Sequence, residues 1–333
     1  MSTFAVSSSK LASEPLAAFV REHYGLSATT TCNLLRGGLN DTYLIVDGDK
    51  RFVFRVYALD WRSETYISEE IKLLLFLREH GLSISYPLPD STGNYIQRLN
   101  AAEGERFGVL FSYAKGEKLQ NFPATAHEAI GEFMARFHKV TENQHIERAT
   151  YDINILLTKP LEYLSRFLDS DCEEWQYMDG LRKYLSNEFS EERMKSVRPG
   201  IVHLDIWFDN VNIDTDNTIT VFDFDFCGNG WLALDIGYYI MQLCNIEREE
   251  AVYQEKLRAF LQGYEKIIPI PEAEKELLPQ LGLAINYFFI GTQCERFENW
   301  SNGFVSTMYL KRYIVGVIKR YADVRGIVVG YGV

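Results

Sequence analysis

Two stretches decide the fold of this 333-residue chain: Ile201-Val-His-Leu-Asp-Ile-Trp-Phe-Asp-Asn-Val-Asn-Ile213 and Ile219-Thr-Val-Phe-Asp-Phe-Asp225. Each contains a short apolar strand, and a polar turn joins the two strands, so together they predict a hairpin. Paired strands would bring Asn210, at the start of one strand, close to Asp223, at the end of the other. An amide oxygen and a carboxylate placed there could share a hard cation such as Mg²⁺, which prefers oxygen ligands.

Asp205 lies five residues before Asn210, on the loop that enters the predicted hairpin. From this position its carboxylate could take the proton from an attacking hydroxyl while a cation neutralises phosphate charge. The spacing of His203, Asp205, Asn210 and Asp223 is a specific combination, whereas a lone His-x-Asp would be weak. The alternative is a polar loop whose Asp and Asn residues serve only the turn geometry.

The remaining sequence predicts a sheet-rich first third followed by a helical remainder. We expect a small domain of residues 1–113, a helical domain of residues 114–333, and a hinge at 113–116 between them. Asp47-Gly48 predicts a hairpin turn, Ser63 a helix N-cap and Gly25 a helix C-cap. The expected helices are 14–25, 63–80, 125–141, 156–190, 231–265 and 272–324, and the expected strands are 30–46 with a break at Gly37-Gly38, 51–57, 95–99 and 106–113.

Composition argues against several classes of protein. The net charge is −12 and no cluster of Lys and Arg is present, so we expect no nucleic-acid partner. No apolar run approaches the ~20 residues of a membrane-spanning helix, and the N-terminus does not resemble a secretory signal. We therefore expect a cytoplasmic protein without a membrane partner. The five cysteines are scattered and predict neither a zinc site nor a disulfide framework.

The 201–225 segment resembles the catalytic and metal-binding loops of the aminoglycoside phosphotransferase and choline kinase-like superfamily. The resemblance implies an α+β, bilobal protein-kinase-like fold, with a small antiparallel-sheet N-lobe and a large helical C-lobe. It also implies an ATP-dependent phosphotransferase with an alcohol group as acceptor. In this comparison Asp205 is the catalytic base, and Asn210 and Asp223 are the Mg²⁺ ligands. His203 supports the loop, and Asp225 is a further candidate that assists the metal.

The first third of the chain resembles the ATP-binding lobe of the same superfamily. Residues 34–43 resemble the loop that covers the phosphates, in which Gly37, Gly38 and Asn40 would approach ATP. Residues 52–57 resemble the strand that carries the phosphate-binding cation. That position holds Arg55, where protein kinases have Lys, and Arg can bind phosphate bidentately.

Two further parts of the ATP site follow from the same resemblance. Glu70 best matches the helix glutamate that pairs with the strand cation, and Glu69 is the alternative, since one residue turns a helix face by about 100°. Residues 109–116 resemble the hinge strand, where backbone groups of Ser112 and Ala114 would bind adenine.

The resemblance also covers residues that would support the catalytic loop and residues that would bind the acceptor. We expect His138 to be a packed structural residue and Asp235 to anchor the catalytic loop by hydrogen bonds. The acceptor would be a small-molecule hydroxyl compound, and a cationic one suits the aromatic segment 287–300 with its carboxylates. Candidate acceptor-binding residues are Trp207, Asp209, Glu295 and Glu298; the alternative is that these aromatics are helix core with charges outside. Choline, an aminoglycoside, homoserine and other amino alcohols all remain open.

Three functions remain in competition. A small-molecule kinase that uses ATP and Mg²⁺ is favoured by the complete set of Asp205, Asn210, Asp223 and Arg55. A protein Ser/Thr kinase of the stress-response type would share the scaffold, but no Ala-Pro-Glu segment or long activation loop follows Asp223. A non-catalytic nucleotide-binding scaffold is the third, and the intact base and metal ligands argue against it. The oligomeric state is open.

Overall fold

The computed structural model describes residues 4–119, 121–215, 218–298 and 304–330. The chain forms two compact units, which are described one at a time: the first comprises the residues up to Ala114 together with Glu298, and the second comprises the other described residues. Within the described ranges, no helix combines the length and the apolar character that crossing a membrane requires.

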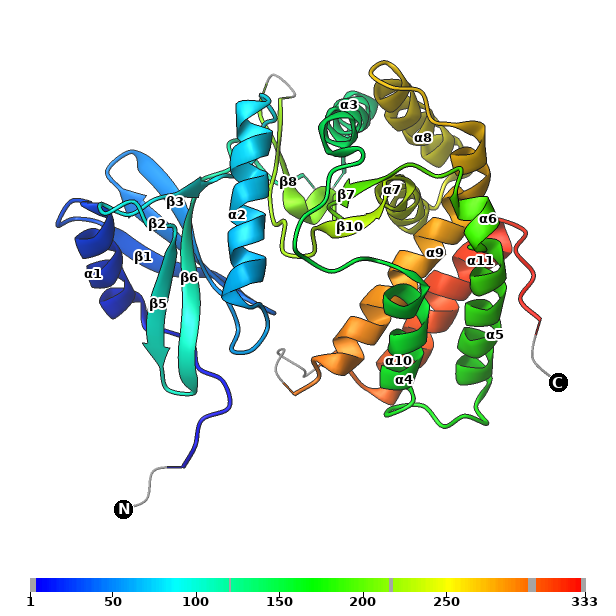
Figure 1. Ribbon diagram of the computed structural model, residues 1–333, viewed down its shortest axis with the longest axis horizontal. Helices are drawn as coiled ribbons and strands as arrows, with labels where there is room; N and C mark the ends of the chain where they lie inside the picture. Colours follow the sequence, from blue (N-terminus) through cyan, green and yellow to red (C-terminus); the bar gives the residue numbers. More distant parts are fainter. Residues whose placement is uncertain (1–3, 120, 216–217, 299–303, 331–333) are drawn as a thin grey trace. The chain divides into compact units, whose positions relative to one another are not determined.

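The first unit is built on an antiparallel six-stranded sheet (Figure 1). Its strand order is β1-β2-β3-β6-β4, and β5 pairs with β6. The predicted turn at Asp47-Gly48 is confirmed: β2 and β3 pair Asp47 with Lys50, and Gly48 takes a φ of 60° between them. The two-residue β4 was not predicted. The strands are β1 Thr31–Gly37, β2 Asp41–Asp47, β3 Lys50–Val56, β4 Pro87–Leu88, β5 Ile96–Ala101 and β6 Gly104–Ser112.

Two helices, α1 (Ser13–Tyr24) and α2 (Glu64–Glu79), flank this sheet. Leu16, Ala17 and Val20 of α1 pack with the buried side chains on one sheet face, which include Phe54 of β3. Side chains alternate along a strand, so Arg55 points to the other face, where it meets α2. Both predicted caps are confirmed: Ser63 accepts a hydrogen bond from the Tyr66 N–H (3.2 Å), and Gly25 ends α1 at a φ of 62°.

The second unit is mainly helical and contains two small antiparallel pairs of strands. β7 (Pro199–Val202) pairs with β10 (Gly228–Trp231), and β8 (Val211–Ile213) pairs with β9 (Ile219–Val221). The second pair confirms the predicted hairpin. The helices are α3 Ala124–Thr141, α4 Lys159–Leu164, α5 Glu173–Glu188, α6 Glu191–Met194, α7 Ala233–Ile246, α8 Glu250–Glu265, α9 Glu272–Glu295, α10 Thr307–Tyr313 and α11 Arg320–Val324, with π-helical turns at Asn154–Thr158 and Ile314–Lys319.

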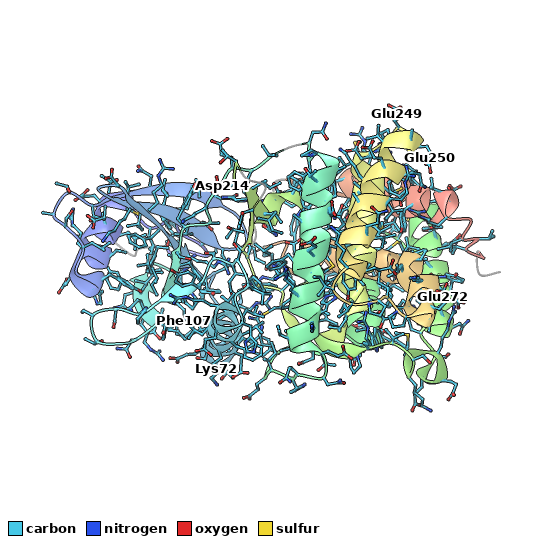
Figure 2. The ribbon with its side chains drawn as sticks, turned by 90° about the horizontal axis from the view of Figure 1, so that it is seen from above. Lys72, Phe107, Asp214, Glu249, Glu250 and Glu272 are labelled. Carbon is cyan, nitrogen blue, oxygen red and sulfur yellow. The ribbon has the colours of Figure 1, made fainter. Side chains whose placement is uncertain are left out.

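The three long helices predicted for 156–190, 231–265 and 272–324 are wrong, because each is interrupted. The first breaks within 165–172, where the Ser165 hydroxyl donates to the Leu161 carbonyl oxygen (2.8 Å), a local bond that often bends a helix. The second breaks at 247–249, next to Glu250 (Figure 2), with neither Pro nor Gly to stop it. Tertiary packing decides this break, since α7 packs against α9 while α8 packs against α3.

The α7–α9 contact depends on two glycines. A Cβ on Gly237 of α7 would lie 2.6 Å from the Leu278 carbonyl oxygen of α9, and one on Gly282 of α9 would lie 2.5 Å from the Gly237 carbonyl oxygen. Real Cβ atoms do not approach backbone so closely, so only glycine allows these helices to touch here. The position of α7 is therefore set by its backbone contact with α9.

His127 of α3 predicts a pH dependence of stability. It is buried, and its Nδ1 lies 2.8 Å from the hydroxyl of Tyr239 on α7. Burial lowers the pKa of His127 to about 4, and the Lys256 ammonium adds to this effect. In the unfolded chain the imidazole has its ordinary pKa of about 6.5. Between this pH and about pH 4 the unfolded state binds a proton that the folded state does not, so stability falls as the pH falls through this window.

The expected result is measurable by urea unfolding at a series of pH values. Between pH 7 and pH 4 the wild type should lose about 3 kcal/mol more than His127→Gln, which cannot be protonated there. Parallel stability curves for the two proteins would contradict this role for His127.

Candidate active site

The loop after β7 is held by the buried Asp235 on the first turn of α7. Its Oδ2 accepts from the His203 N–H (3.0 Å) and its Oδ1 from the Leu204 N–H (2.6 Å). Leu204 has a φ of 69°, a conformation that costs a non-glycine residue of order 1–3 kcal/mol and needs such support. His138, also buried, lies between Asp235 Oδ2 (3.2 Å) and the Tyr264 hydroxyl (2.8 Å). The expected anchoring by Asp235 and packing of His138 are confirmed.

His203 ties this loop to the end of the β8–β9 hairpin. Its Nδ1 accepts from the Asp205 N–H (3.1 Å), so the proton of the neutral ring is on Nε2, which lies 3.3 Å from the Phe222 carbonyl oxygen. Burial lowers the pKa of His203, which keeps the imidazole neutral. The ring also packs on Phe224, with 4.3 Å between centroids. His203 thus supports the backbone on both sides of the site.

Both oxygens of the Asp205 carboxylate accept a hydrogen bond. Oδ2 accepts from Asn210 Nδ2 (2.7 Å), which also donates to the Asp205 carbonyl (3.0 Å). Oδ1 accepts from the hydroxyl of Tyr238 (2.8 Å), a residue of α7 that sequence reasoning missed. A signal existed: Tyr238 follows Asp235 by three residues, so both lie on the same face of the helix.

Burial is the largest influence on the acidity of Asp205, and it raises the pKa to about 8. The Tyr238 hydrogen bond opposes this rise, the charge of Asp223 adds to it, the Asn210 hydrogen bond opposes it, and the charge of Asp209 adds to it. A raised pKa makes the ionised carboxylate a stronger proton acceptor, and general-base catalysis is most efficient when the pKa of the base lies near the working pH.

The hairpin brings Asn210 and Asp223 together, as the spacing predicts. Val211 pairs with Val221, and the Phe222 N–H donates to the Asn210 carbonyl oxygen (3.0 Å), so Asp223 is the next residue along. Asp223 has a φ of 65°, which turns the chain out of the strand. The Asn210 amide nitrogen is committed to Asp205, which would leave its amide oxygen available to a cation. Two oxygen donors fit Mg²⁺, which keeps several waters and phosphate oxygens in its shell.

The other candidates of this segment occupy different environments. Asp225 is buried, and its backbone carbonyl accepts a hydrogen bond from Arg148. Trp207 and Asp209 are both partly exposed, and the Trp207 ring packs against Phe208 with centroids 4.1 Å apart. Trp207 and Asp209 are therefore partly accessible to solvent, whereas Asp225 lies in the interior.

In the first unit, Arg55 pairs with Glu70. The Arg55 guanidinium lies 3.1 Å from Glu70 Oε1, and the Tyr57 hydroxyl donates to Glu70 Oε2 (3.3 Å). Both partners are buried, with side chains 10% and 1% exposed. Glu69 instead pairs with Lys72 (2.6 Å), whose side chain is 71% exposed on α2 (Figure 2). The choice between the two glutamates is therefore settled in favour of Glu70.

The predicted phosphate-covering loop and hinge have partners within the first unit. Asn40 Oδ1 accepts from the Ala58 N–H (3.1 Å), and a Cβ on Gly37 would meet the Lys10 ammonium at 2.0 Å. Gly38 lies between them in the turn that joins β1 and β2. The Ser112 N–H donates to the Tyr86 carbonyl (2.8 Å), its carbonyl accepts from the Ser85 hydroxyl (2.6 Å), and Ala114 is buried. The nucleotide-binding roles of Gly37, Gly38, Asn40, Ser112 and Ala114 remain predictions.

The aromatic segment of α9 divides between core and surface. Tyr287 is fully buried and donates to the Met178 carbonyl, whereas Phe288 and Phe289 are partly exposed. Phe289 packs on Tyr238, with centroids 5.5 Å apart. Glu295 lies six residues further, about 9 Å along the helix, and interacts with Tyr163. Glu298 is exposed beyond the helix, and Trp300 lies outside the described residues.

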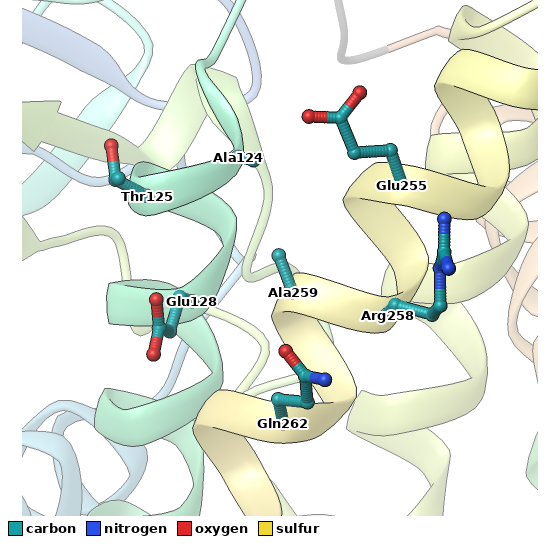
Figure 3. Close-up of a pocket in the computed structure, with 7 residues that line it drawn as sticks. All are labelled: Ala124, Thr125, Glu128, Glu255, Arg258, Ala259 and Gln262. Atoms are coloured by element: carbon teal, nitrogen blue, oxygen red, sulfur yellow. The ribbon is translucent and has the colours of Figure 1, made fainter.

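A separate hollow of about 330 Å³ lies between α3 and α8 (Figure 3). Its lining contains polar, charged and apolar side chains, and one of the lining residues, Glu128, is paired with Lys266. None of the predicted site residues belongs to it. The lining residues are Ala124, Thr125, Glu128, Glu255, Arg258, Ala259 and Gln262.

Comparison with known proteins places the chain in a family. The model of the phosphotransferase enzyme family matches residues 31–270. A protein of Deinococcus radiodurans is 32% identical over 294 residues, which make up 86% of this chain and 84% of that protein. A homoserine kinase of Bradyrhizobium diazoefficiens is 29% identical over 237 residues, or 70% of this chain and 68% of the kinase.

Comparison with solved structures also finds a kinase. The structure of the microcompartment-associated aminopropanol kinase matches with a TM-score of 0.77 and 21% identity, covering 95% of this chain and 99% of that one. This likeness confirms the expected α+β, protein-kinase-like fold with a small antiparallel-sheet lobe and a large helical lobe. The chain therefore belongs to the phosphotransferase enzyme family and is an ATP-dependent phosphotransferase with an alcohol group as acceptor.

Proposed function

We propose that this chain phosphorylates the hydroxyl of a small amino alcohol, with Asp205 as the general base. The observation that carries the proposal is the fixed Asp205 carboxylate, with a donor on each oxygen and the Asn210–Asp223 hairpin beside it. In the reaction Asp205 accepts the hydroxyl proton, the alcohol oxygen bonds to the γ-phosphorus of ATP, and the bond to ADP breaks.

The proposed metal ligands are Asn210 and Asp223, which offer one amide oxygen and one carboxylate. When bound there, Mg²⁺ would neutralise charge on the phosphate oxygens. Arg55 is the proposed phosphate cation of the first unit, and Glu70 orients its guanidinium by their buried ion pair. Arg favours this task because its planar fork matches phosphate oxygens.

Three observations support an amino alcohol as the acceptor. The named relative is a homoserine kinase and the matching structure is an aminopropanol kinase, and each of these acceptors carries a hydroxyl and an amine. Phe226, Phe288 and Phe289 are partly exposed and pack on one another, with centroids 5.2 Å apart for Phe226 and Phe289. Phe289 also packs on Tyr238, whose hydroxyl bonds the base, so this cluster offers aromatic faces to an ammonium group. The net charge of −12 also favours a cation.

The test is ATP consumption by the purified protein against a panel of acceptors. Homoserine, aminopropanols, choline, aminoglycosides and sugars are compared, with magnesium present or chelated. We expect turnover with an amino alcohol, and loss of turnover when its hydroxyl or its amine is replaced by hydrogen. Phosphorylation of a protein substrate without response to any small alcohol would instead favour the protein-kinase alternative. No ATP consumption with any compound of the panel would favour the non-catalytic nucleotide-binding scaffold.

A further inference from the structure

The hydroxyl of Tyr238 occupies a place that neither the motif nor the family comparison assigns. Tyr238 lies on α7, 33 residues after Asp205, and donates a 2.8 Å hydrogen bond to Asp205 Oδ1. Its side chain is buried, and its ring packs on Phe289 of α9 with centroids 5.5 Å apart. Burial and the neighbouring Asp205 carboxylate raise the pKa of Tyr238, so the hydroxyl keeps its proton and acts as a donor.

Asn210 bonds both the backbone and the carboxylate of Asp205, whereas Tyr238 bonds the carboxylate alone. His203 Nδ1 and Asn210 Nδ2 bond the Asp205 N–H and carbonyl oxygen, which fixes the backbone. The terminal torsion of an aspartate is broad, so a fixed backbone does not by itself orient the carboxylate. Among the described residues, the hydrogen bonds to its two oxygens come from Asn210 and Tyr238. Tyr238 is the one of these two donors that is not also a proposed metal ligand.

One face of α7 therefore carries both supports of the loop. Asp235, one turn before Tyr238, accepts from the His203 and Leu204 N–H groups, while Tyr238 donates to the Asp205 carboxylate. The backbone contact of Gly237 with Gly282 sets the position of this helix against α9. The Tyr238 hydroxyl is thus placed against Asp205 Oδ1 by a helix whose position is fixed by close packing.

We propose that Tyr238 is a positioning residue for phosphotransfer, whose hydroxyl orients the Asp205 carboxylate toward the acceptor hydroxyl. The inference rests on the proposed role of Asp205 as the base. It predicts that the hydroxyl acts on the rate of the chemical step, through Asp205, and leaves ATP binding unchanged.

The test is Tyr238→Phe, which keeps the ring against Phe289 and removes only the hydroxyl. We expect kcat to fall by about 10- to 100-fold, as for a modest misplacement of a reacting group, with the KM for ATP changed less than about twofold. Tyr239→Phe is the matched control: it removes a buried hydroxyl from the same helix, but one that bonds His127 Nδ1. The control should keep the wild-type kcat.

Two further measurements separate positioning from a structural effect. In the Asp205→Ala background, adding Tyr238→Phe should cause no additional loss of the residual rate, because the hydroxyl acts through the missing carboxylate. A wild-type kcat in Tyr238→Phe, or equal losses of kcat in Tyr238→Phe and Tyr239→Phe, would overturn the inference. Full turnover by Asp205→Asn would overturn the base itself, so failure of the proposed function is distinguished from failure of the Tyr238 assignment alone.

Discussion

Asp205→Asn is expected to lower kcat by roughly 10³-fold, within the usual contribution of a general base. An amide can still accept the hydrogen bond from Tyr238, but it cannot take the proton from the acceptor hydroxyl. The affinity for ATP and Mg²⁺ should remain close to that of the wild type, because Asp205 is not among the proposed ligands of either. Single-turnover kinetics for the rate and calorimetry for nucleotide binding would measure the two effects separately.

A matched control lies in the same hairpin. Asp214 is in the turn between β8 and β9 (Figure 2), where its carboxylate accepts from the Thr215 N–H (2.7 Å). Asp214→Asn makes the same chemical change away from the base and should leave kcat unaltered. If Asp205→Asn turned over at the wild-type rate, Asp205 would be removed as the base, whereas equal losses in both variants would indicate damage to the hairpin.

The second large effect is expected on stability, from the Arg55–Glu70 pair. Glu70→Ala removes the carboxylate that pairs with the buried Arg55 guanidinium and accepts from the Tyr57 hydroxyl. Removing one partner of a buried ion pair costs about 3–5 kcal/mol, because a charge stays buried and uncompensated. Denaturant unfolding of the first unit would measure the loss in free energy of unfolding. The KM for ATP should also rise, because the Arg55 guanidinium is no longer oriented.

Glu69→Ala provides the comparison, since Glu69 is the neighbouring residue on the same helix. Its partner Lys72 is largely exposed, and an ion pair of that kind contributes about 0–1 kcal/mol. A similar loss of stability in the two variants would show that the Arg55–Glu70 pair has no special role. A large loss confined to Glu70→Ala would support it.

Local chemistry explains why several features could be predicted without a structure. The hairpin that joins Asn210 to Asp223 follows from two apolar strands and a polar turn, which are contiguous in the chain. The Gly48 turn, the Ser63 cap and the Gly25 cap likewise depend on interactions within a few residues. The sequence therefore predicted these elements, because their causes lie within the same short segments.

Helix boundaries were harder to predict from the sequence where tertiary packing decides them. The break between α7 and α8 contains no Gly or Pro, so periodicity alone predicts one long helix over 231–265. The chain turns there because each helix packs against a different partner, and the close contact of Gly237 with Gly282 fixes one of these pairings. Such contacts join residues far apart in the chain and leave no local pattern.

The sequence by itself determined the loop that carries Asp205 and the hairpin that joins Asn210 to Asp223, because their causes lie within one contiguous segment. Only the tertiary structure decided which glutamate meets Arg55, since neighbouring helix positions differ by about 100° and burial of one face selects Glu70. The tertiary structure also supplied Tyr238, which reaches Asp205 through the placement of α7 against α9. Groups that are close in the chain were predictable, whereas a contact between distant residues, such as that of Tyr238 with Asp205, depends on packing.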